Sequence, residues 1–253
     1  MSYIVIKIGG STLTELHDTT IEDIAQLKQQ GMRPIIVHGG GPFINQALKQ
    51  QGVHTSFKDG LRVTTDKVLT ITSQILVGMV NPQLVGKMNH THIQSIGLNG
   101  VDAKLFDVKP LNEKYGYVGE AININTAVID HITEHYIPII ASIGMHRSSS
   151  HLYNINADTL AYKIAQILKA PIYLLSDIPG VIIEDKVKPT LTSEHIQHYI
   201  EQEQIYGGMI PKVQEAVTAI EHGCQNVVIA AGNEAHVVQR IRDGQQLGTT
   251  IQL

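Results

Sequence analysis

The chain has 253 residues, a formal net charge of −4 and a pI near 6.3, and at about 150 residues per domain it predicts one two-lobed domain or two small ones. The mild acidity excludes a general binder of nucleic acid or anionic membranes, because both need a concentrated basic surface. A hydrophobic content of 43% excludes disorder, and the single cysteine, Cys224, excludes a disulfide framework and a cysteine-rich metal centre.

Short β-branched runs alternate with amphipathic helical patterns along the chain. Because the runs are apolar on both faces, they are typical of buried parallel strands, and the alternation predicts an α/β sandwich with helices on both faces of the sheet. The predicted strands are Tyr3–Ile8, Pro34–Val37, Ile93–Ile96, Ile137–Ala141, Ile172–Leu175, Val227–Ala230 and Thr249–Gln252. The predicted helices cover about residues 20–30, 42–51, 65–79, 80–91, 125–135, 158–168, 192–202, 209–222 and 234–242.

Two further features concern the organisation of the chain. The stretch 103–120 lacks helical periodicity and predicts a β-hairpin, and the change from helix to strand at 169–172 predicts a lobe boundary that separates residues 1–171 from 172–253. The N-terminus reads as a strand rather than a signal peptide, and no run approaches the ~18 consecutive apolar residues of a membrane helix. The expected location is therefore the cytoplasm.

Four glycine-containing clusters lie at junctions of predicted elements: three follow predicted strands and one opens a predicted helix. In an open α/β sheet, ligands bind where strands end and helices begin, and glycine lets backbone N–H groups approach an anion there. Any single cluster is equally well explained as a tight turn, but four at such junctions indicate anion binding. The nucleotide motifs GxxxxGK[ST] and GxGxxG are absent. The clusters are Gly9-Gly10, Gly39-Gly40-Gly41, Asp177-Ile178-Pro179-Gly180 and Gly207-Gly208.

Three cationic residues lie beside these clusters. Lys7 sits within an apolar strand, where a buried ammonium requires a carboxylate or a ligand phosphate opposite it. Lys212 lies in the first turn of a helix, where it opposes the helix dipole unless an anion binds between them. Arg62 is suited to clamp a carboxylate in a bidentate fork. On position alone, an exposed lysine and a surface-loop arginine explain the last two equally well.

The segment 153–158 (YNINAD) enters a predicted helix. Asn and Asp are preferred helix caps, so capping is the plain explanation of Asp158. The functional alternative is that Asp158 orients the two lysines and that Asn154 hydrogen-bonds a substrate. His131 and His135 fit an HxxEH zinc pattern, but no other feature supports a hydrolase, and a solvated helix face is expected. Cys224 is expected to be a buried, inert thiol.

Six segments together resemble the amino-acid kinase family, in the right order over essentially the whole chain. They are KIGGS at 7–11, VHGGGP at 37–42, DGLRVT at 59–64, YNINAD at 153–158, LLSDIPGV at 174–181 and GGMIPK at 207–212. GLRVT and NxNAD are most similar to members that phosphorylate N-acetyl-L-glutamate. The resemblance implies an open, mainly parallel sheet of about eight strands in a three-layer sandwich, with an N-terminal lobe for the acyl amino acid and a C-terminal lobe for ATP.

The resemblance also implies roles for individual residues. Lys7 and Lys212 match the lysines that neutralise the transferring phosphoryl group, and Asp158 matches the aspartate that organises them. Phe43 departs from the family, which has an acidic residue after HGGGP, and is expected to change packing more than chemistry. The implied substrate contacts are Gly40, Gly41, Arg62 (on the α-carboxylate) and Asn154. The implied nucleotide contacts are Gly9, Gly10, Asp177, Ile178, Pro179, Gly180, Ile205, Tyr206, Gly207 and Gly208.

The implied reaction transfers phosphate from ATP to the γ-carboxylate of N-acetyl-L-glutamate, the second step of arginine synthesis. Mg²⁺ would be held by the ATP phosphates rather than by protein side chains. Two alternatives stay open: a kinase of a related acid such as N-acetylaminoadipate, and a non-catalytic nucleotide-binding relative. We also expect a homodimer, with the apolar helix 65–79 as a candidate surface. Arginine-inhibited members of the family carry an extra helix before the first strand. The first strand here is predicted to begin at Tyr3, so the resemblance implies insensitivity to arginine.

Overall fold

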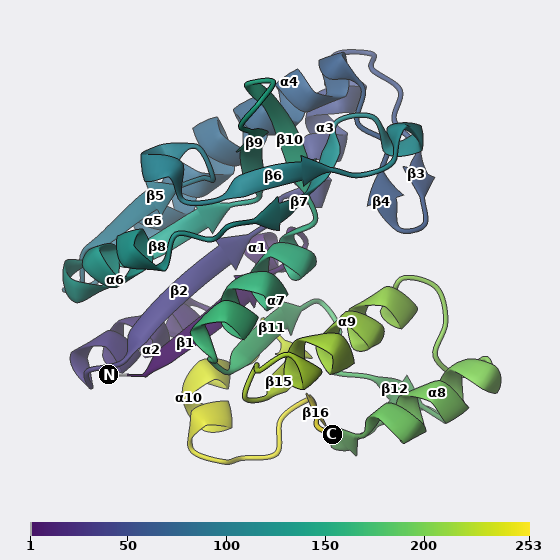
Figure 1. The fold of residues 1–253 in the computed structure, drawn as a ribbon. Helices are drawn as coiled ribbons and strands as arrows, with labels where there is room; N and C mark the ends of the chain where they lie inside the picture. Colours follow the sequence, from purple (N-terminus) through teal and green to yellow (C-terminus); the bar gives the residue numbers. More distant parts are fainter. Residues whose placement is uncertain (1) are drawn as a thin grey trace. The chain divides into compact units, whose positions relative to one another are not determined.

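The computed structural model describes residues 2–253, which form two compact units (Figure 1). The first unit combines the residues up to Pro34 with Ala161–Leu253, and the second unit is Ile35–Leu160. The sequence predicts a single lobe boundary at 169–172, and the division into these two units differs from it. The reason is that β1 (Tyr3–Ile8) pairs in parallel with β11 (Ile172–Ser176), so the N-terminal strand belongs with the C-terminal segment.

The main sheet has eight strands and is mostly parallel, which confirms the predicted α/β fold class. The first unit contributes the order β14-β16-β15-β11-β1 and the second the order β2-β8-β5. Within these two groups, only β15 and β16 pair antiparallel. The two-residue edge strand β14 was not predicted because it is too short to show a period. The remaining bounds are β2 (Arg33–His38), β5 (Ser95–Leu98), β8 (Ile137–Ala141), β14 (Thr190–Leu191), β15 (Val227–Ala231) and β16 (Thr249–Ile251).

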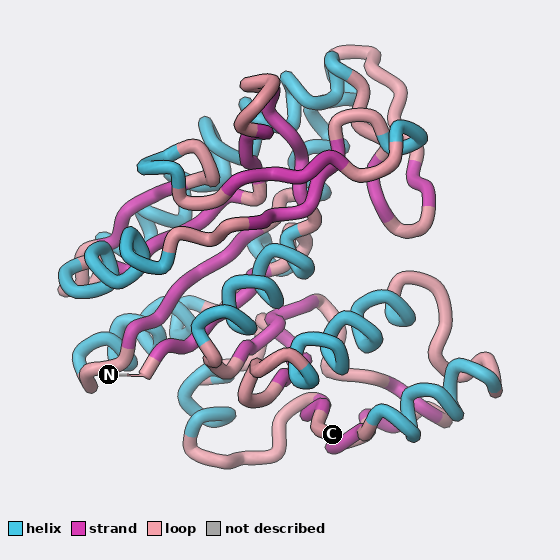
Figure 2. Tube along the Cα trace, viewed as in Figure 1, coloured by secondary structure: helices cyan, strands magenta, loops and turns pink. Residues whose placement is uncertain are grey.

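Helices flank the strands of the first unit (Figures 1 and 2). α2 packs against α10, and α9 runs beside α8 and β16. The buried Asp23 carboxylate ties α2 to α10, because it accepts hydrogen bonds from His236 Nδ1 at 2.9 Å and from the Gln239 backbone N–H at 3.2 Å. The bounds are α1 (Thr12–Glu15), α2 (Asp18–Gln29), α7 (Ala157–Leu168, which enters from the second unit), α8 (Ser193–Glu201), α9 (Met209–Glu221) and α10 (Val237–Arg242).

The helices of the second unit enclose an apolar core. Two helices were predicted at 65–79 and 80–91, and the structure joins them through a π-helical turn at Leu76–Val80. By length and composition alone, the run Asp66–Asn89 could cross a membrane, and 44% of its most apolar window is buried inside the protein. The bounds are α3 (Gly41–Gln50), α4 (Asp66–Ile75), α5 (Asn81–Asn89) and α6 (Thr126–His135). The core includes Ile44, Leu48, Val68, Ile71, Leu76 and Ile143.

A small closed barrel with the order β10-β7-β6-β9 completes the second unit. β6 and β7 form the antiparallel hairpin predicted within 103–120, although β7 extends to Ile122. The partner hairpin of β9 and β10 was not predicted, because its second strand starts at an exposed, polar His151 and follows a serine-rich turn. The bounds are β3 (Phe57–Lys58), β4 (Leu61–Arg62), β6 (Asp107–Pro110), β7 (Val118–Ile122), β9 (Ile143–His146), β10 (His151–Ile155), β12 (Ile182–Ile183) and β13 (Lys186–Val187), with 3₁₀ turns at Asp102–Lys104 and Glu113–Tyr115.

His38 ends β2 and is fully buried. Its Nδ1 lies 2.9 Å from the Gly39 carbonyl oxygen, which can only accept, so Nδ1 carries the proton. Nε2 lies 3.0 Å from the Asn81 amide nitrogen and accepts from it, and the same amide donates to the Ile139 carbonyl at 2.8 Å. Burial lowers the pKa of His38 to about 4, so the imidazole is neutral in the folded protein at pH 7.

We expect His38 to make the protein less stable as the pH falls from about 6.5 toward 4. The unfolded chain takes up a proton near its ordinary pKa of 6.5, whereas the folded chain resists protonation down to about 4. Between pH 7.5 and 5 this difference removes about 2 kcal/mol from the free energy of unfolding. Urea unfolding at the two pH values should show this loss in the wild type and its absence in His38→Gln. The matched control is the exposed His54→Gln, and parallel pH dependences in all three proteins would contradict the assignment.

Candidate functional site

The first unit places Lys7 beside the glycine turn that follows β1. Lys7 is 8% exposed, and a Cβ added to Gly9 would lie 3.5 Å from its Nζ and 3.0 Å from Thr12 Oγ1. The Gly9 backbone N–H donates to the Leu175 carbonyl at 3.0 Å, which joins the ends of β1 and β11. The bare glycine backbone therefore lets an ammonium group approach the carboxyl end of the parallel strands, where ligands bind in open α/β sheets.

A carboxylate lies at the end of β11 in the same unit. Burial alone would raise the pKa of Asp177, but hydrogen bonds from Ser176 and Ser11, its own backbone N–H and the Lys212 charge outweigh burial and lower that pKa. The Ser176 hydroxyl donates to Asp177 Oδ1 at 3.0 Å. The Asp177 carboxylate at the end of β11 therefore interacts both with Ser11 in the turn after β1 and with the Lys212 ammonium.

Lys212 stands in the first turn of α9, as predicted, after the Gly207-Gly208 pair. Gly207 has φ +57, a conformation that side chains rarely adopt, and Gly208 is the residue before the helix. The Tyr162 hydroxyl of α7 donates to the Lys212 carbonyl oxygen at 2.9 Å. This contact fixes the first turn of α9 against α7, and neither its distance nor its donor could be predicted from sequence spacing.

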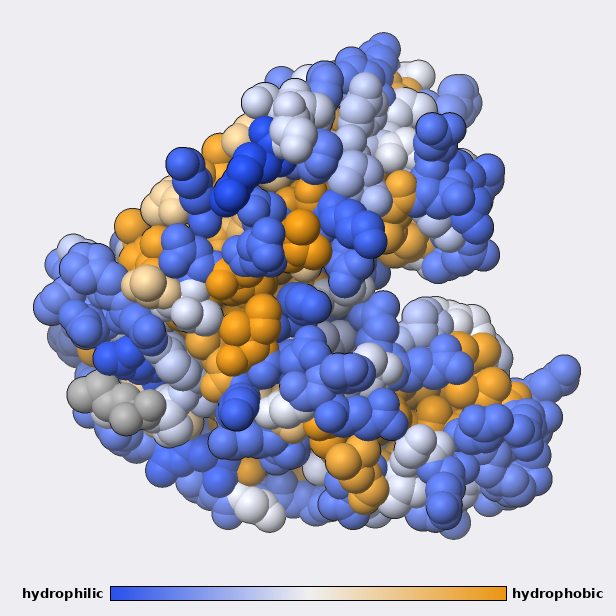
Figure 3. Space-filling model, viewed as in Figure 1, coloured by the Kyte–Doolittle hydropathy of each residue, from blue (hydrophilic) through white to orange (hydrophobic). Residues whose placement is uncertain are grey.

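A hollow of about 170 Å³ opens where the β11–β12 loop meets the start of α9. Apolar side chains gather on the surface where α8 and the start of α9 meet (Figure 3). Tyr206 stands 74% exposed at this hollow, unlike the buried Ile205 beside it. Of the predicted residues, the structure brings Ile178, Gly180, Ile205 and Tyr206 together here. The remaining lining residues, Val181, Ile182, Gln204 and Met209, were not predicted, although they flank the predicted ones in sequence.

Gly180 shapes one wall of this hollow. Its φ is +151, and a Cβ would lie 2.7 Å from Thr249 Oγ1 and 2.8 Å from Val187 Cγ1. Thr249 Oγ1 also accepts a hydrogen bond from the Val181 N–H at 2.8 Å. Only glycine fits this close approach without moving β13 or β16. Packing against these two strands therefore explains why the predicted Asp177–Gly180 segment ends in glycine.

The second unit presents a buried cation on β4. Arg62 is 7% exposed, its Nη1 donates to Thr55 Oγ1 at 3.2 Å and its Nη2 donates to Asn45 Oδ1 at 2.7 Å. The Phe57 ring lies 4.7 Å from Arg62 Cζ. Burial lowers the pKa of Arg62, although an arginine stays protonated at pH 7. These hydrogen-bond partners are neutral, and a buried guanidinium held by neutral groups favours an anionic ligand.

Asn154 connects to Arg62 through a threonine. Asn154 Nδ2 lies 3.3 Å from Thr64 Oγ1, and the Thr64 hydroxyl donates to the Arg62 carbonyl oxygen at 2.9 Å. β10 therefore brings Asn154 to the strand that carries Arg62, although the two are far apart in the sequence. Thr64 was not predicted as a connecting residue.

The glycines after β2 provide a second turn in this unit. A Cβ on Gly40 would lie 2.7 Å from Leu76 Cδ2, so only glycine allows the π-helical turn to pack this closely. A Cβ on Gly41 would meet open space, so the start of α3 is open to a ligand. Phe43, the departure from the family pattern, lies in the first turn of α3 and is partly buried.

The cap of α7 is Asn156, not Asp158. Asn156 Oδ1 accepts hydrogen bonds from the backbone N–H groups of Asp158 at 2.8 Å and Thr159 at 3.3 Å. Asn156 therefore provides the cap that the sequence analysis considered for Asp158. The Asp158 carboxylate lies in the first turn of α7.

The chain is similar to known proteins over essentially its whole length. The model of the amino acid kinase family matches residues 2–231. The chain belongs to the amino acid kinase family. A curated relative named acetylglutamate kinase, from Staphylococcus saprophyticus, is 80% identical over 253 residues and covers 100% of both chains. Another acetylglutamate kinase, from Staphylococcus aureus, is 49% identical and covers 99% of this chain and 98% of its own. The solved structure of smu.665 from Streptococcus mutans is 31% identical, covers 98% of each chain and has a TM-score of 0.88.

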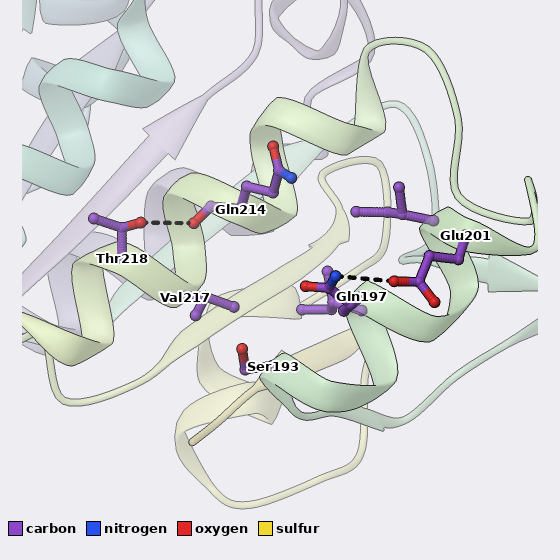
Figure 4. Close-up of a pocket in the computed structure, with 8 residues that line it drawn as sticks. Ser193, Gln197, Glu201, Gln214, Val217 and Thr218 are labelled. Atoms are coloured by element: carbon purple, nitrogen blue, oxygen red, sulfur yellow. Dashed lines mark hydrogen bonds between the residues drawn. The ribbon is translucent and has the colours of Figure 1, made fainter.

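Within this amino acid kinase fold, a larger hollow of about 320 Å³ lies between α8 and α9, apart from the predicted site residues (Figure 4). On its wall, Gln197 Nε2 donates to Glu201 Oε1 at 2.9 Å. The labelled residues of the hollow are Ser193, Gln197, Glu201, Gln214, Val217 and Thr218.

Two other sequence features stay outside the site. His131 and His135 are both exposed on α6, and within the described residues 2–253 no three His, Cys, Asp or Glu side chains gather as a ligand set for a metal ion. Cys224 is buried and its thiol donates to the Ala170 carbonyl at 3.1 Å. Burial raises the pKa of Cys224 to about 11, as expected for an inert thiol.

Proposed function

We propose that the chain transfers the γ-phosphoryl group of ATP to the γ-carboxylate of N-acetyl-L-glutamate and forms an acyl phosphate. The observation that carries this proposal is the 80% identity over full length to a relative named acetylglutamate kinase. The buried Arg62 guanidinium, held by neutral groups, supports an acidic acceptor.

The chemistry of this acceptor requires no general base. A carboxylate is already ionised at pH 7, so catalysis consists of bringing two anions into line and stabilising the charge of the moving phosphoryl group. We assign this stabilisation to Lys7 and Lys212, and we assign Asp158 to orienting the two ammonium groups. The carboxyl end of β1 and the first turn of α9, where these lysines lie, support the assignment.

The acceptor is assigned to the second unit. Arg62 binds the α-carboxylate in a bidentate fork, Asn154 hydrogen-bonds the substrate, and Gly40 and Gly41 offer backbone N–H groups at the start of α3. The hydrogen-bond chain from Asn154 through Thr64 to Arg62 supports one shared binding surface.

We assign ATP to the first unit. This unit is larger than the nucleotide-binding lobe predicted from the sequence, which covered residues 172–253 alone. The base and ribose occupy the hollow between the β11–β12 loop and α9, and the phosphates reach the turns after β1 and before α9. Mg²⁺, held by the phosphates, would supply further neutralisation of their charge. The proposed contacts are Gly9, Gly10, Asp177, Ile178, Pro179, Gly180, Ile205, Tyr206, Gly207 and Gly208.

Tyr206→Ala should raise the KM for ATP about tenfold and leave the melting temperature unchanged. The ring is 74% exposed, so it contributes little to folding, and an exposed aromatic ring at a hollow is suited to stack on a nucleobase. Tyr206→Phe keeps the ring face and should retain the wild-type KM. Steady-state kinetics with varied ATP test this. Equal KM values for the alanine variant and the wild type would remove Tyr206 from the nucleotide site.

The function is tested by following Mg²⁺- and ATP-dependent ADP release across acidic acceptors. We expect a strong preference for N-acetyl-L-glutamate over N-acetylaminoadipate, glutamate, aspartate, carbamate and UMP. Preference for N-acetylaminoadipate would keep the phosphoryl-transfer mechanism and show that the acceptor assigned to the pocket around Arg62 is wrong. A folded protein without turnover on any acceptor would favour the non-catalytic, nucleotide-binding alternative.

The assembly and location belong to the same proposal. We assign the enzyme to the cytoplasm, and we expect a homodimer that uses the apolar helix at 65–79. Val77, which is 38% exposed on the π-helical turn, supports an apolar contact there. Light scattering on the purified chain tests the dimer, and a monomeric mass at working concentrations would contradict it.

A further inference from the structure

We propose that Asn45 is a positioning residue that orients the Arg62 guanidinium for the acceptor carboxylate. The inference rests on the proposed function, because it takes an acidic acceptor as the ligand of Arg62. Asn45 lies outside all the residues assigned to substrate or nucleotide.

Three groups contact the guanidinium. Asn45 Oδ1 accepts from Nη2 at 2.7 Å, the shortest of its hydrogen bonds, and Thr55 Oγ1 accepts from Nη1 at 3.2 Å. The Phe57 ring covers one face at 4.7 Å from Cζ, and Phe57 is the cross-strand partner of Arg62 in the β3–β4 hairpin. A guanidinium has five donors, so these contacts fix its plane and leave other donors for a ligand.

Asn45 contacts the Arg62 guanidinium from α3, whereas Arg62 itself lies in the β3–β4 hairpin. It lies in the first half of α3, on the exposed side, whereas Ile44, Ala47 and Leu48 bury the opposite side in the core of the second unit. α3 begins at Gly41, whose Cβ position faces open space. Asn45 therefore fixes the distance between the Arg62 fork and the glycine turn, the two places where we assign the acceptor.

The chemical type of the side chain matters. An amide oxygen accepts the Nη2 hydrogen bond and carries no charge, so the guanidinium is oriented and its charge is preserved for the ligand. An aspartate would accept the same hydrogen bond and would neutralise the guanidinium. A role in positioning thus predicts that aspartate raises the acceptor KM more than alanine does. A merely structural role predicts the reverse order, because aspartate keeps the hydrogen bond that alanine loses.

The experiment measures steady-state kinetics of the full chain with varied N-acetyl-L-glutamate and varied ATP. We expect Asn45→Ala to raise the KM for the acceptor about tenfold, with kcat and the KM for ATP within about twofold of wild type. Asn45→Asp should raise the acceptor KM by a further factor of about ten. The matched control is Gln46→Ala, the exposed neighbour on α3, which should match the wild type.

A double-mutant cycle shows whether Asn45 acts through Arg62. In an Arg62→Ala background, adding Asn45→Ala should change the acceptor KM by less than about twofold. A tenfold effect that persists in this background, or single variants that leave the acceptor KM unchanged, would overturn the proposal. If the wild type prefers another acidic acceptor, the proposed function fails and the cycle is run with that acceptor. If calorimetry shows that the wild type binds no carboxylate, both proposals fall.

Discussion

Replacement of Lys7 or Lys212 by methionine should lower kcat by on the order of 10²–10³, which corresponds to about 3–4 kcal/mol of lost transition-state stabilisation. Methionine keeps an unbranched apolar stem of similar length and removes only the charge. Because charge spread over the transferring phosphoryl group develops fully in the transition state, the loss should fall on kcat more than on the KM for either substrate.

The two lysines differ in what else their removal does. Lys7 is 8% exposed in β1, so the melting temperature of Lys7→Met is measured beside its activity, and the loss of kcat is compared between folded proteins. Lys212 sits in the first turn of α9, where its charge opposes the helix dipole but attracts the Asp177 carboxylate, so Lys212→Met should change the melting temperature little. Loss of activity without loss of stability separates an electrostatic role from damage to the fold.

Lys67→Met on the exposed start of α4 is the matched control and should retain wild-type turnover. Single-turnover measurements of acyl phosphate formation would show whether the chemical step itself is slowed. Near-normal turnover in either Lys7→Met or Lys212→Met would remove that lysine from the catalytic assignment.

The sequence predicted the features that depend on local pattern. Buried β-branched runs such as Tyr3–Ile8 and Ile172–Leu175 became β1 and β11 with nearly unchanged bounds, because strands apolar on both faces carry a strong signal. The positions of Lys212 in the first turn of α9 and of the glycine pair before it were also correct. These are relations between residues a few positions apart.

Features that depend on tertiary contacts could not be predicted in this way. The division into units follows the pairing of β1 with β11, which no position along the chain reveals. The cap of α7 is Asn156 rather than the equally suitable Asp158, and local preference does not separate them. Asn45 resembles any polar residue on an exposed helix side until the hairpin brings Arg62 within 2.7 Å of it.

Arg62→Ala should raise the KM for N-acetyl-L-glutamate roughly 100-fold, about 2.7 kcal/mol, because a carboxylate loses a charge-assisted bidentate partner. The KM for ATP should stay within about twofold, since Arg62 is assigned to the acceptor alone. Removal of the guanidinium leaves Asn45 and Thr55 with neutral side chains that water can satisfy, so the fold should persist, and circular dichroism checks this.

Arg62→Lys is the sharper variant of this test. Lysine keeps the charge but replaces the planar fork with a point charge that cannot contact Asn45, Thr55 and a carboxylate at the same time. We therefore expect most of the increase in the acceptor KM to persist in Arg62→Lys. If Arg62→Lys restored wild-type affinity, general charge attraction would suffice and the fork held by Asn45 would have no role. If even Arg62→Ala left the acceptor KM unchanged, the α-carboxylate would bind elsewhere, and the buried guanidinium would be a feature of the β3–β4 hairpin alone.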